Sequence, residues 1–100
     1  MTIESRELAL YTINTGNIYR GQTQAVIANL AKKMHKEQFD KALAVKAFEH
    51  VAEVGAKQYQ KEFGTPRQAW NKMFTASDRK LAAEEMLEHY MEQIEEQSKQ

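Results

Sequence analysis

"KALAVKAFEHVAEVGAKQYQKEF", residues 41–63, is the longest unbroken helical pattern in the chain and decides its fold. Apolar and small residues recur there three to four positions apart, which is the spacing of one buried helix face. Asp40 precedes the pattern as a helix cap and Gly64 follows it as a stop. The expected inner face consists of Ala44, Ala47, Phe48, Val51, Val54 and Gly55. Three of these residues are Ala or Gly, so a neighbouring helix is expected to approach closely.

The sequence before residue 41 predicts two further helices. Residues 3–13 form the first, with Thr2 as its cap. Asn14, Thr15 and Gly16 are expected to end it, because Asn and Gly accept a left-handed conformation. Residues 22–36 form the second, because Ile27, Leu30, Ala31 and Met34 follow the spacing of a buried stripe. The segment "KEQFD", residues 36–40, is expected to be a turn.

The sequence after Gly64 predicts a short helix and a long one. Thr65 and Pro66 have the pattern of a cap followed by a first-turn proline. Thr75 and Asp78 resemble a capping box for the last helix. That helix is expected to turn Ala83, Met86, Leu87, Tyr90 and Ile94 inward, and the tail "EEQSKQ", residues 95–100, is expected to fray.

These elements predict an all-α fold: a compact antiparallel bundle of four to five helices in a single domain, residues 1–100. One hundred residues suffice for one modest core. The chain has no cysteine, which excludes disulfides and cysteine zinc sites. It has no apolar run as long as a membrane span, and its start, "MTIESRELAL", lacks the features of a secretory peptide. A cytoplasmic protein without membrane contact is expected.

The charges balance in total but not along the chain. The whole sequence has 14 basic and 14 acidic residues, yet the 25 residues from position 76 onward hold seven acids and only three bases. Two candidate partner-binding faces follow from this separation of charge. One is basic and contains Tyr19, Arg20, Lys32, Lys33 and Lys36. The other is an acidic face on the last helix, formed by Glu84, Glu85, Glu88 and Glu92.

The sequence contains no recognisable catalytic pattern. Glu85 with His89, and His50 with Glu53, have helical spacings that bring two metal ligands together, but a stable site needs three or four. Serines in a nucleophile elbow and a phosphate-binding glycine loop are both missing. No enzyme activity, metal or cofactor is therefore expected.

Aromatic residues gather near the end of the longest helix. Tyr59, Phe63, Trp70 and Phe74 fall within 16 positions, together with Met73. Large side chains at this density fill the core of a small bundle. An exposed subset of them would instead indicate a partner site. The sequence alone leaves both interpretations open.

Four stretches in this order resemble a family of small helical proteins carried by phages, plasmids and other mobile elements. They are "LYTINTGNIY", "VIANLAKKM", "FDKALAVKAFEHVAEVGAKQYQKEFG" and "FTASDRKLAAEEMLEHYMEQI". Members are mostly uncharacterised, so the resemblance transfers no catalytic residues. It implies a small accessory protein that acts by binding, such as an inhibitor of a host defence complex of the anti-CRISPR kind.

The leading hypothesis is a non-enzymatic inhibitor that binds a host protein or ribonucleoprotein complex in the host cytoplasm. It would act through the basic face or through the acidic last helix as a local phosphate mimic. A small regulator that binds nucleic acid directly is the first alternative, and a small metal-dependent enzyme is the second. The oligomeric state and the identity of the partner stay open.

Overall fold

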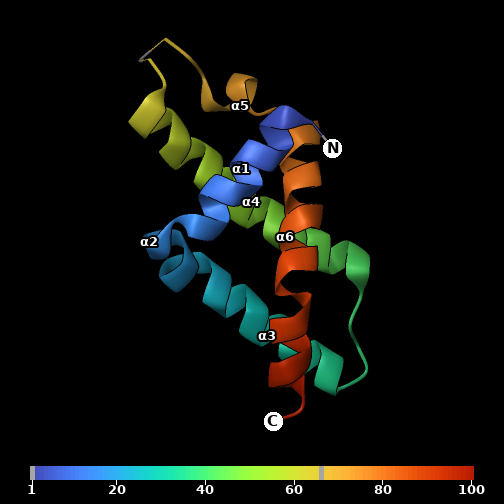
Figure 1. Cartoon of the computed structure of the whole chain (residues 1–100). Helices are drawn as coiled ribbons and strands as arrows, with labels where there is room; N and C mark the ends of the chain where they lie inside the picture. Colours follow the sequence, from blue (N-terminus) through green and yellow to red (C-terminus); the bar gives the residue numbers. More distant parts are fainter. Residues whose placement is uncertain (1, 66) are drawn as a thin grey trace.

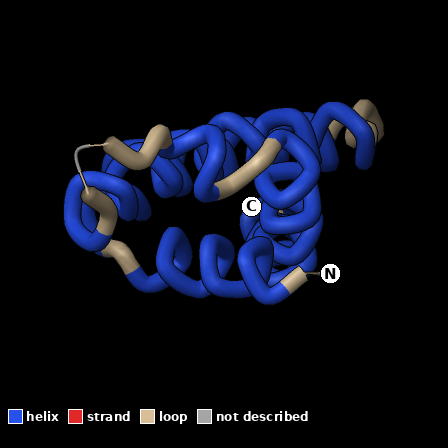
Figure 2. Tube along the Cα trace, turned by 90° about the horizontal axis from the view of Figure 1, so that it is seen from above, coloured by secondary structure: helices blue, strands red, loops and turns tan. Residues whose placement is uncertain are grey.

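The computed structural model describes residues 2–65 and 67–100, and most of these residues are helical. The four long helices are α1 (Ile3–Asn14), α3 (Gln24–His35), α4 (Lys41–Phe63) and α6 (Ala76–Ser98) (Figure 1). Three short elements connect them: α2 (Gly16–Ile18), the π-helix η1 (Tyr19–Thr23) and α5 (Trp70–Met73). Neither described part contains a strand (Figure 2). The all-α fold predicted from the sequence is confirmed.

Helix α6 is central to the packing, because it contacts each of α1, α3 and α4. In Figure 1 it runs down the length of the molecule, and α4 crosses behind it. Its buried face includes every residue predicted to point inward, namely Ala83, Met86, Leu87, Tyr90 and Ile94. Ala82 is buried in addition. Tyr90 stacks on Phe48 of α4, with 5.9 Å between the ring centroids and an interplanar angle of 8°.

The inner face of α4 is broader than predicted. Ala44, Phe48, Val51 and Gly55 are buried as expected, whereas Ala47 and Val54 are only half-buried. Three further residues are buried: Val45, Ala52 and Ala56. The difference arises because α4 lies between α6 and α1, so two adjoining stripes of its surface are covered.

Helices α1 and α4 cross at Gly55, and they lie so close together there that no side chain larger than that of glycine fits. A Cβ atom built on Gly55 would lie 2.1 Å from Oγ1 of Thr12. The Thr12 hydroxyl donates a hydrogen bond to the Leu8 carbonyl at 2.8 Å, and the Thr12 side chain is fully buried. A hydrogen at position 55 is therefore needed for the two helices to pack, as the run of small residues predicts.

The N-termini of α1 and α6 are capped and also joined to each other. Both predicted caps are confirmed, and each is a full capping box, from Thr2 to Ser5 and from Thr75 to Asp78. The Thr2 hydroxyl also donates to Oδ1 of Asp78 at 2.9 Å. Burial raises the pKa of Asp78, but hydrogen bonds from Thr75 and Thr2 outweigh that effect and hold the pKa below its usual value.

The predicted helix stop between the first two helices is at the predicted position, but the predicted left-handed conformation is wrong. None of the described glycines has a positive φ, and the break is a single extended residue, Thr15, with φ −93° and ψ 106°. The chain then resumes a helix at Gly16 and continues through the π-turn of η1 into α3. The second helical segment therefore starts six residues before the predicted position 22. The left-handed residue lies instead at Glu37, with φ 58°, where α3 ends.

Two predictions near the C-terminal half are also corrected. The short helix begins at Trp70, after an extended Ala69, and not after Thr65; Pro66 lies outside the described residues. The tail predicted to fray from residue 95 is mostly helical in the structure, because α6 continues to Ser98. Gly64 does end α4, but with φ −87°. A Cβ atom there would lie 2.7 Å from the Gln60 carbonyl oxygen, so close approach favours glycine at this position.

Candidate functional site

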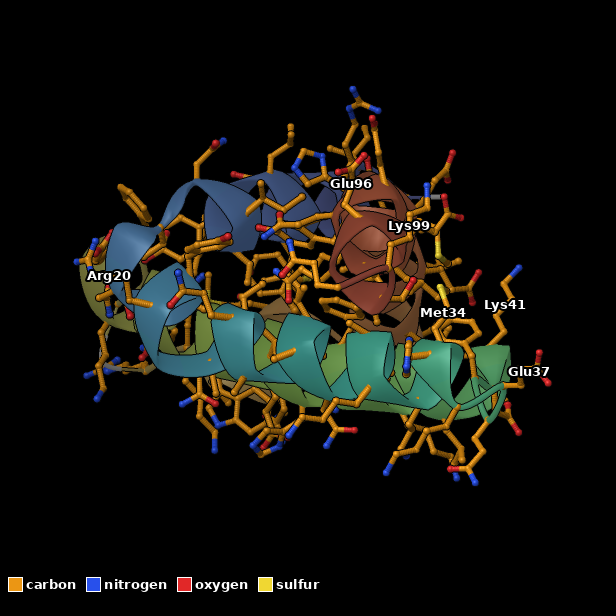
Figure 3. The ribbon with its side chains drawn as sticks, turned by 90° about the horizontal axis from the view of Figure 1, so that it is seen from below. Arg20, Met34, Glu37, Lys41, Glu96 and Lys99 are labelled. Carbon is orange, nitrogen blue, oxygen red and sulfur yellow. The ribbon has the colours of Figure 1, made fainter. Side chains whose placement is uncertain are left out.

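The five residues of the predicted basic face do not form one patch. Arg20 belongs to η1, whereas the lysines are on the last turns of α3 and just after it. Helical rise separates Arg20 from Lys33 by about 20 Å. Figure 3 shows this separation, with Arg20 at one end of the molecule and Met34 and Glu37 near the other. The Arg20 guanidinium lies beside Gly16, where an added Cβ atom would be 3.0 Å from its Nη1.

Tyr19 contributes to the interior more than to a binding surface. Its hydroxyl accepts a hydrogen bond from Nε2 of Gln93 on α6 at 2.9 Å. Its ring lies 6.1 Å from the ring of Tyr90, centroid to centroid. The π-turn directs Tyr19 toward α6 while its neighbour Arg20 is exposed. The sequence does not predict this turn, because π-helices are rare and occur mostly as single turns inserted in α-helices.

The three lysines at the end of α3 lie on two different sides. Lys32 and Lys36 line a shallow hollow against the end of α6, with His35, Gln97 and Gln100. Lys33 lines a separate hollow between α3 and α4, beside Leu43. His35 also contacts the α6 end directly, since its Nδ1 lies 2.8 Å from the Ser98 carbonyl oxygen. These lysines flank two helix contacts and do not converge on one point.

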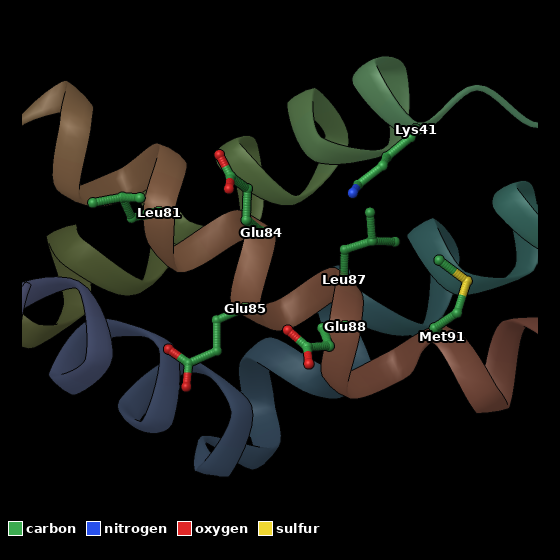
Figure 4. A pocket seen from close by; sticks show the side chains of 7 residues that line it. All are labelled: Lys41, Leu81, Glu84, Glu85, Leu87, Glu88 and Met91. Atoms are coloured by element: carbon green, nitrogen blue, oxygen red, sulfur yellow. The ribbon is translucent and has the colours of Figure 1, made fainter. Parts of the chain in front are cut away.

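The four predicted acidic residues share one helix, and three of them line a groove. Glu84, Glu85 and Glu88 lie along a groove of ≈ 430 Å³ beside α6, and Glu92 is exposed one turn beyond Glu88. Figure 4 shows Lys41 extending over this groove from the start of α4 toward Leu87. Side chains of Leu81, Leu87 and Met91 supply its apolar lining. We call this region the α6 groove: Lys41, Leu81, Glu84, Glu85, Leu87, Glu88 and Met91.

The carboxylates of the α6 groove are not equivalent. Glu85 is largely covered, with 19% of its side chain exposed, and its Oε1 lies 3.8 Å from Nη1 of Arg6 on α1. Glu84 and Glu88 are exposed, and Figure 4 shows them one turn apart on α6. Glu84 also lines a second hollow of ≈ 540 Å³, where α4 supplies Ala42 and Val45. Glu85 therefore faces Arg6 of α1, whereas no Lys or Arg nitrogen of the described residues lies within 4.0 Å of Glu84 or Glu88.

The histidines are dispersed. His50 lies in a shallow polar hollow with Glu49, Glu53 and Arg79. His89 packs its ring edge-on against Tyr90, at 4.8 Å between centroids. Within residues 2–65 and 67–100, no group of three or more His, Asp or Glu side chains is arranged to hold a metal ion.

The aromatic residues divide into a buried part and an exposed part. Phe74 is 3% exposed and belongs to the core, and Trp70 is half-buried. Phe63 is 65% exposed, although its ring contacts those of Tyr11 and Tyr59. Both interpretations of the aromatic cluster therefore apply, each to different members.

Comparisons with models of protein families, with curated proteins and with solved structures found no match. The resemblance to proteins of mobile elements thus remains a prediction from the sequence. Among the described helices, none is long and apolar enough to cross a membrane.

Proposed function

We propose that the protein is a non-enzymatic accessory protein of a phage or other mobile element. In this proposal it inhibits a host protein or ribonucleoprotein complex, in the manner of an anti-CRISPR protein, by binding a basic surface with the α6 groove. The observation that supports the proposal is the convergence of exposed carboxylates with an apolar lining: Glu84 and Glu88 beside Leu81 and Met91.

Charge gives this surface a class of partner. Residues four apart on a helix lie roughly 6 Å from each other, so Glu84, Glu88 and Glu92 form a row of negative charges. A protein surface that binds nucleic-acid phosphates carries Lys and Arg. The glutamate row would occupy such a surface as a local substitute for phosphates, and charge attraction would speed the encounter.

The apolar lining supplies what a row of charges lacks. Exposed ion pairs contribute little affinity, typically below about 1 kcal/mol each. The side chains of Leu81 and Met91 offer area that a partner can bury, and Met adapts its shape to different partners. A stable complex therefore needs both components, and the α6 groove has both.

Affinity capture from host lysate, with quantitative mass spectrometry, tests the proposal. The immobilised chain is compared with a variant carrying Glu84→Gln, Glu88→Gln and Glu92→Gln. We expect a nucleic-acid-binding protein or complex to be recovered with the unchanged chain and to be lost, by tenfold or more, with this variant.

The control is a matched variant carrying Lys32→Gln, Lys33→Gln and Lys36→Gln. It removes the same number of charges, but these charges are positive. It should retain the captured partner. Loss of the partner with the lysine variant alone would transfer the proposed site to α3. Equal recovery by all three proteins would contradict the proposal.

Direct binding of nucleic acid has less support, because the lysines of α3 are divided between two hollows. A gel-shift titration at low salt checks it, since phosphate contacts weaken steeply as salt rises.

A further inference from the structure

The far end of α4 and the outer side of α1 share an exposed aromatic surface that the proposed function does not use. The rings of Tyr11 and Tyr59 meet edge to face, with 5.1 Å between centroids. Phe63 is 4.9 Å from Tyr59 and 6.1 Å from Tyr11, and it is 65% exposed. Three rings from two helices, with Phe63 exposed and Tyr11 and Tyr59 half-buried, thus form an aromatic platform at the surface.

Two carboxylates belong to this platform. Glu7 accepts a hydrogen bond from the Tyr59 hydroxyl, and this bond, more than burial, raises the pKa of Tyr59. Burial, followed by the nearby Glu62 carboxylate, raises the pKa of Tyr11. The hydrogen bond places negative charge at the Tyr59 hydroxyl, whereas the Tyr11 hydroxyl is buried and has no hydrogen-bond partner among the described residues.

Neither carboxylate is neutralised by a cation of the same chain. Among the described residues, no Lys or Arg nitrogen lies within 4.0 Å of Glu7 or Glu62, whereas Glu85 and Glu53 each have such a partner. We call this surface the aromatic end: Glu7, Tyr11, Tyr59, Glu62 and Phe63.

Trp70, close in sequence to the aromatic end, shows the opposite arrangement. The Nζ of Lys57 and the Cζ of Arg79 each lie 5.0 Å from its ring centroid. The chain therefore covers Trp70 with its own cations. Within the described part of the chain, no such cation lies over Phe63, Tyr11 or Tyr59.

We propose that the aromatic end binds an arginine-bearing peptide segment of a partner protein. A guanidinium group matches the surface in two ways. Its plane stacks on an exposed ring such as that of Phe63, and its N–H groups pair with a carboxylate such as that of Glu62. Lysine makes only the point-charge half of this contact. The inference goes beyond the proposed function, because it concerns a second surface and requires nothing of the α6 groove.

A titration of the full chain with a short synthetic peptide containing two arginines tests the inference. The signals of the Tyr11, Tyr59 and Phe63 rings are followed by NMR. We expect these signals to shift with an affinity near 1 mM, about the strength of an isolated contact of this size. The same peptide with citrulline in place of arginine keeps the shape without the charge and should bind at least tenfold more weakly.

Two variants at exposed positions assign the contact. Glu62→Gln removes the charge and is expected to weaken binding by about tenfold. Phe63→Leu keeps an apolar side chain but removes the ring face, and is expected to weaken binding by about threefold. Glu96→Gln, which removes an exposed charge near the end of α6 and outside both surfaces, should leave the affinity unchanged within about twofold.

Three results would overturn the inference. One is the lack of any ring shift at peptide concentrations up to about 10 mM, a tenfold excess over the expected dissociation constant. Another is equal binding of the citrulline peptide. The third is weaker peptide binding with Glu88→Gln but unchanged binding with Glu62→Gln, which would assign the basic peptide to the α6 groove.

Discussion

The α1–α4 crossing and the outward side of α6 differ in how tightly their side chains are packed. At the crossing, Gly55 faces Thr12 with no room for a methyl group. On the outward side of α6, Glu84, Glu88 and Glu92 are exposed, and the α6 groove leaves space beside the helix. The crossing fixes how the helices meet, so its residues are constrained by shape. The glutamates on the outward side are exposed, so packing does not constrain the shape of their side chains.

Gly55→Ala should cause the largest loss of stability. The added Cβ atom would collide with the Thr12 hydroxyl, and the helix has to move to relieve the contact. We expect the free energy of unfolding to fall by about 2–3 kcal/mol, despite alanine's better helix propensity. The melting temperature should decrease by roughly 10–15 °C for a domain of this size.

Two further variants test the cause of that loss. Adding Thr12→Ala removes the colliding hydroxyl and should restore part of the stability, which a double-mutant cycle measures. Gly21→Ala is the matched control, because no atom outside its own helical turn lies within 4 Å of a Cβ atom there. It should raise the free energy of unfolding by about 0.5–1 kcal/mol, as expected for alanine replacing a helical glycine. A comparable loss at both glycines would show that the α1–α4 crossing is not specially tight.

Asp78→Asn should have the next largest effect, because it weakens the joint between the N-termini of α1 and α6. We expect a loss of about 1–2 kcal/mol at neutral pH. The native pKa of Asp78 lies below its usual value, so its charge stabilises the fold above about pH 4, the ordinary pKa of an aspartate.

That contribution should disappear as the pH falls through the lower, folded-state pKa. Denaturant unfolding between about pH 3 and 7 measures it, and the ordinary aspartate pKa of 3.9 lies within this range. The unchanged protein and the variant should differ most at pH 7 and converge in acid. A constant difference across the range would contradict the role assigned to the Asp78 charge.

Tyr19→Phe tests the contact of η1 with α6 and should cause a moderate loss of stability. It removes the hydroxyl that accepts a hydrogen bond from Gln93 and keeps the ring beside Tyr90. The expected loss is about 0.5–1.5 kcal/mol, measured by denaturant unfolding. No loss would indicate that the ring alone anchors η1 to α6.

The smallest effect on stability is expected on the outward side of α6. Replacing Glu84, Glu88 and Glu92 with Gln should change the free energy of unfolding by no more than about 0.5 kcal/mol. The sign should be favourable, since like charges four apart on a helix repel each other. Thermal unfolding measures the change. A loss above about 1 kcal/mol would show that these residues stabilise the fold, so that binding would not be their only role.

The parts predicted correctly from the sequence share one property: their signals are local. Asp40 and the apolar spacing after it define α4 from one end to the other, and Thr75 with Asp78 defines the start of α6. Helix caps and amphipathic spacing involve residues close together in the chain, so they can be recognised from the sequence alone.

The errors occur where contacts with distant residues override local preference. Gly16 has the composition of a helix stop, yet the chain resumes a helix there, and Tyr19 packs on α6. Glu37 takes the left-handed conformation that the sequence assigns to Asn14 or Gly16. The conformation of this turn depends on the direction in which the next helix packs, and that direction is set by residues distant in the sequence.

The sequence by itself determined that this chain is all helical, where its long helices lie and that its acids concentrate in the last one, because spacing, caps and composition are properties of neighbouring residues. Only the tertiary structure decided that Thr2 bonds to Asp78, that the basic residues separate while the carboxylates share a groove, and that Phe63 stays exposed while Phe74 is buried. These outcomes depend on how helices cross, and a crossing is set by the shapes of surfaces that meet from distant parts of the chain.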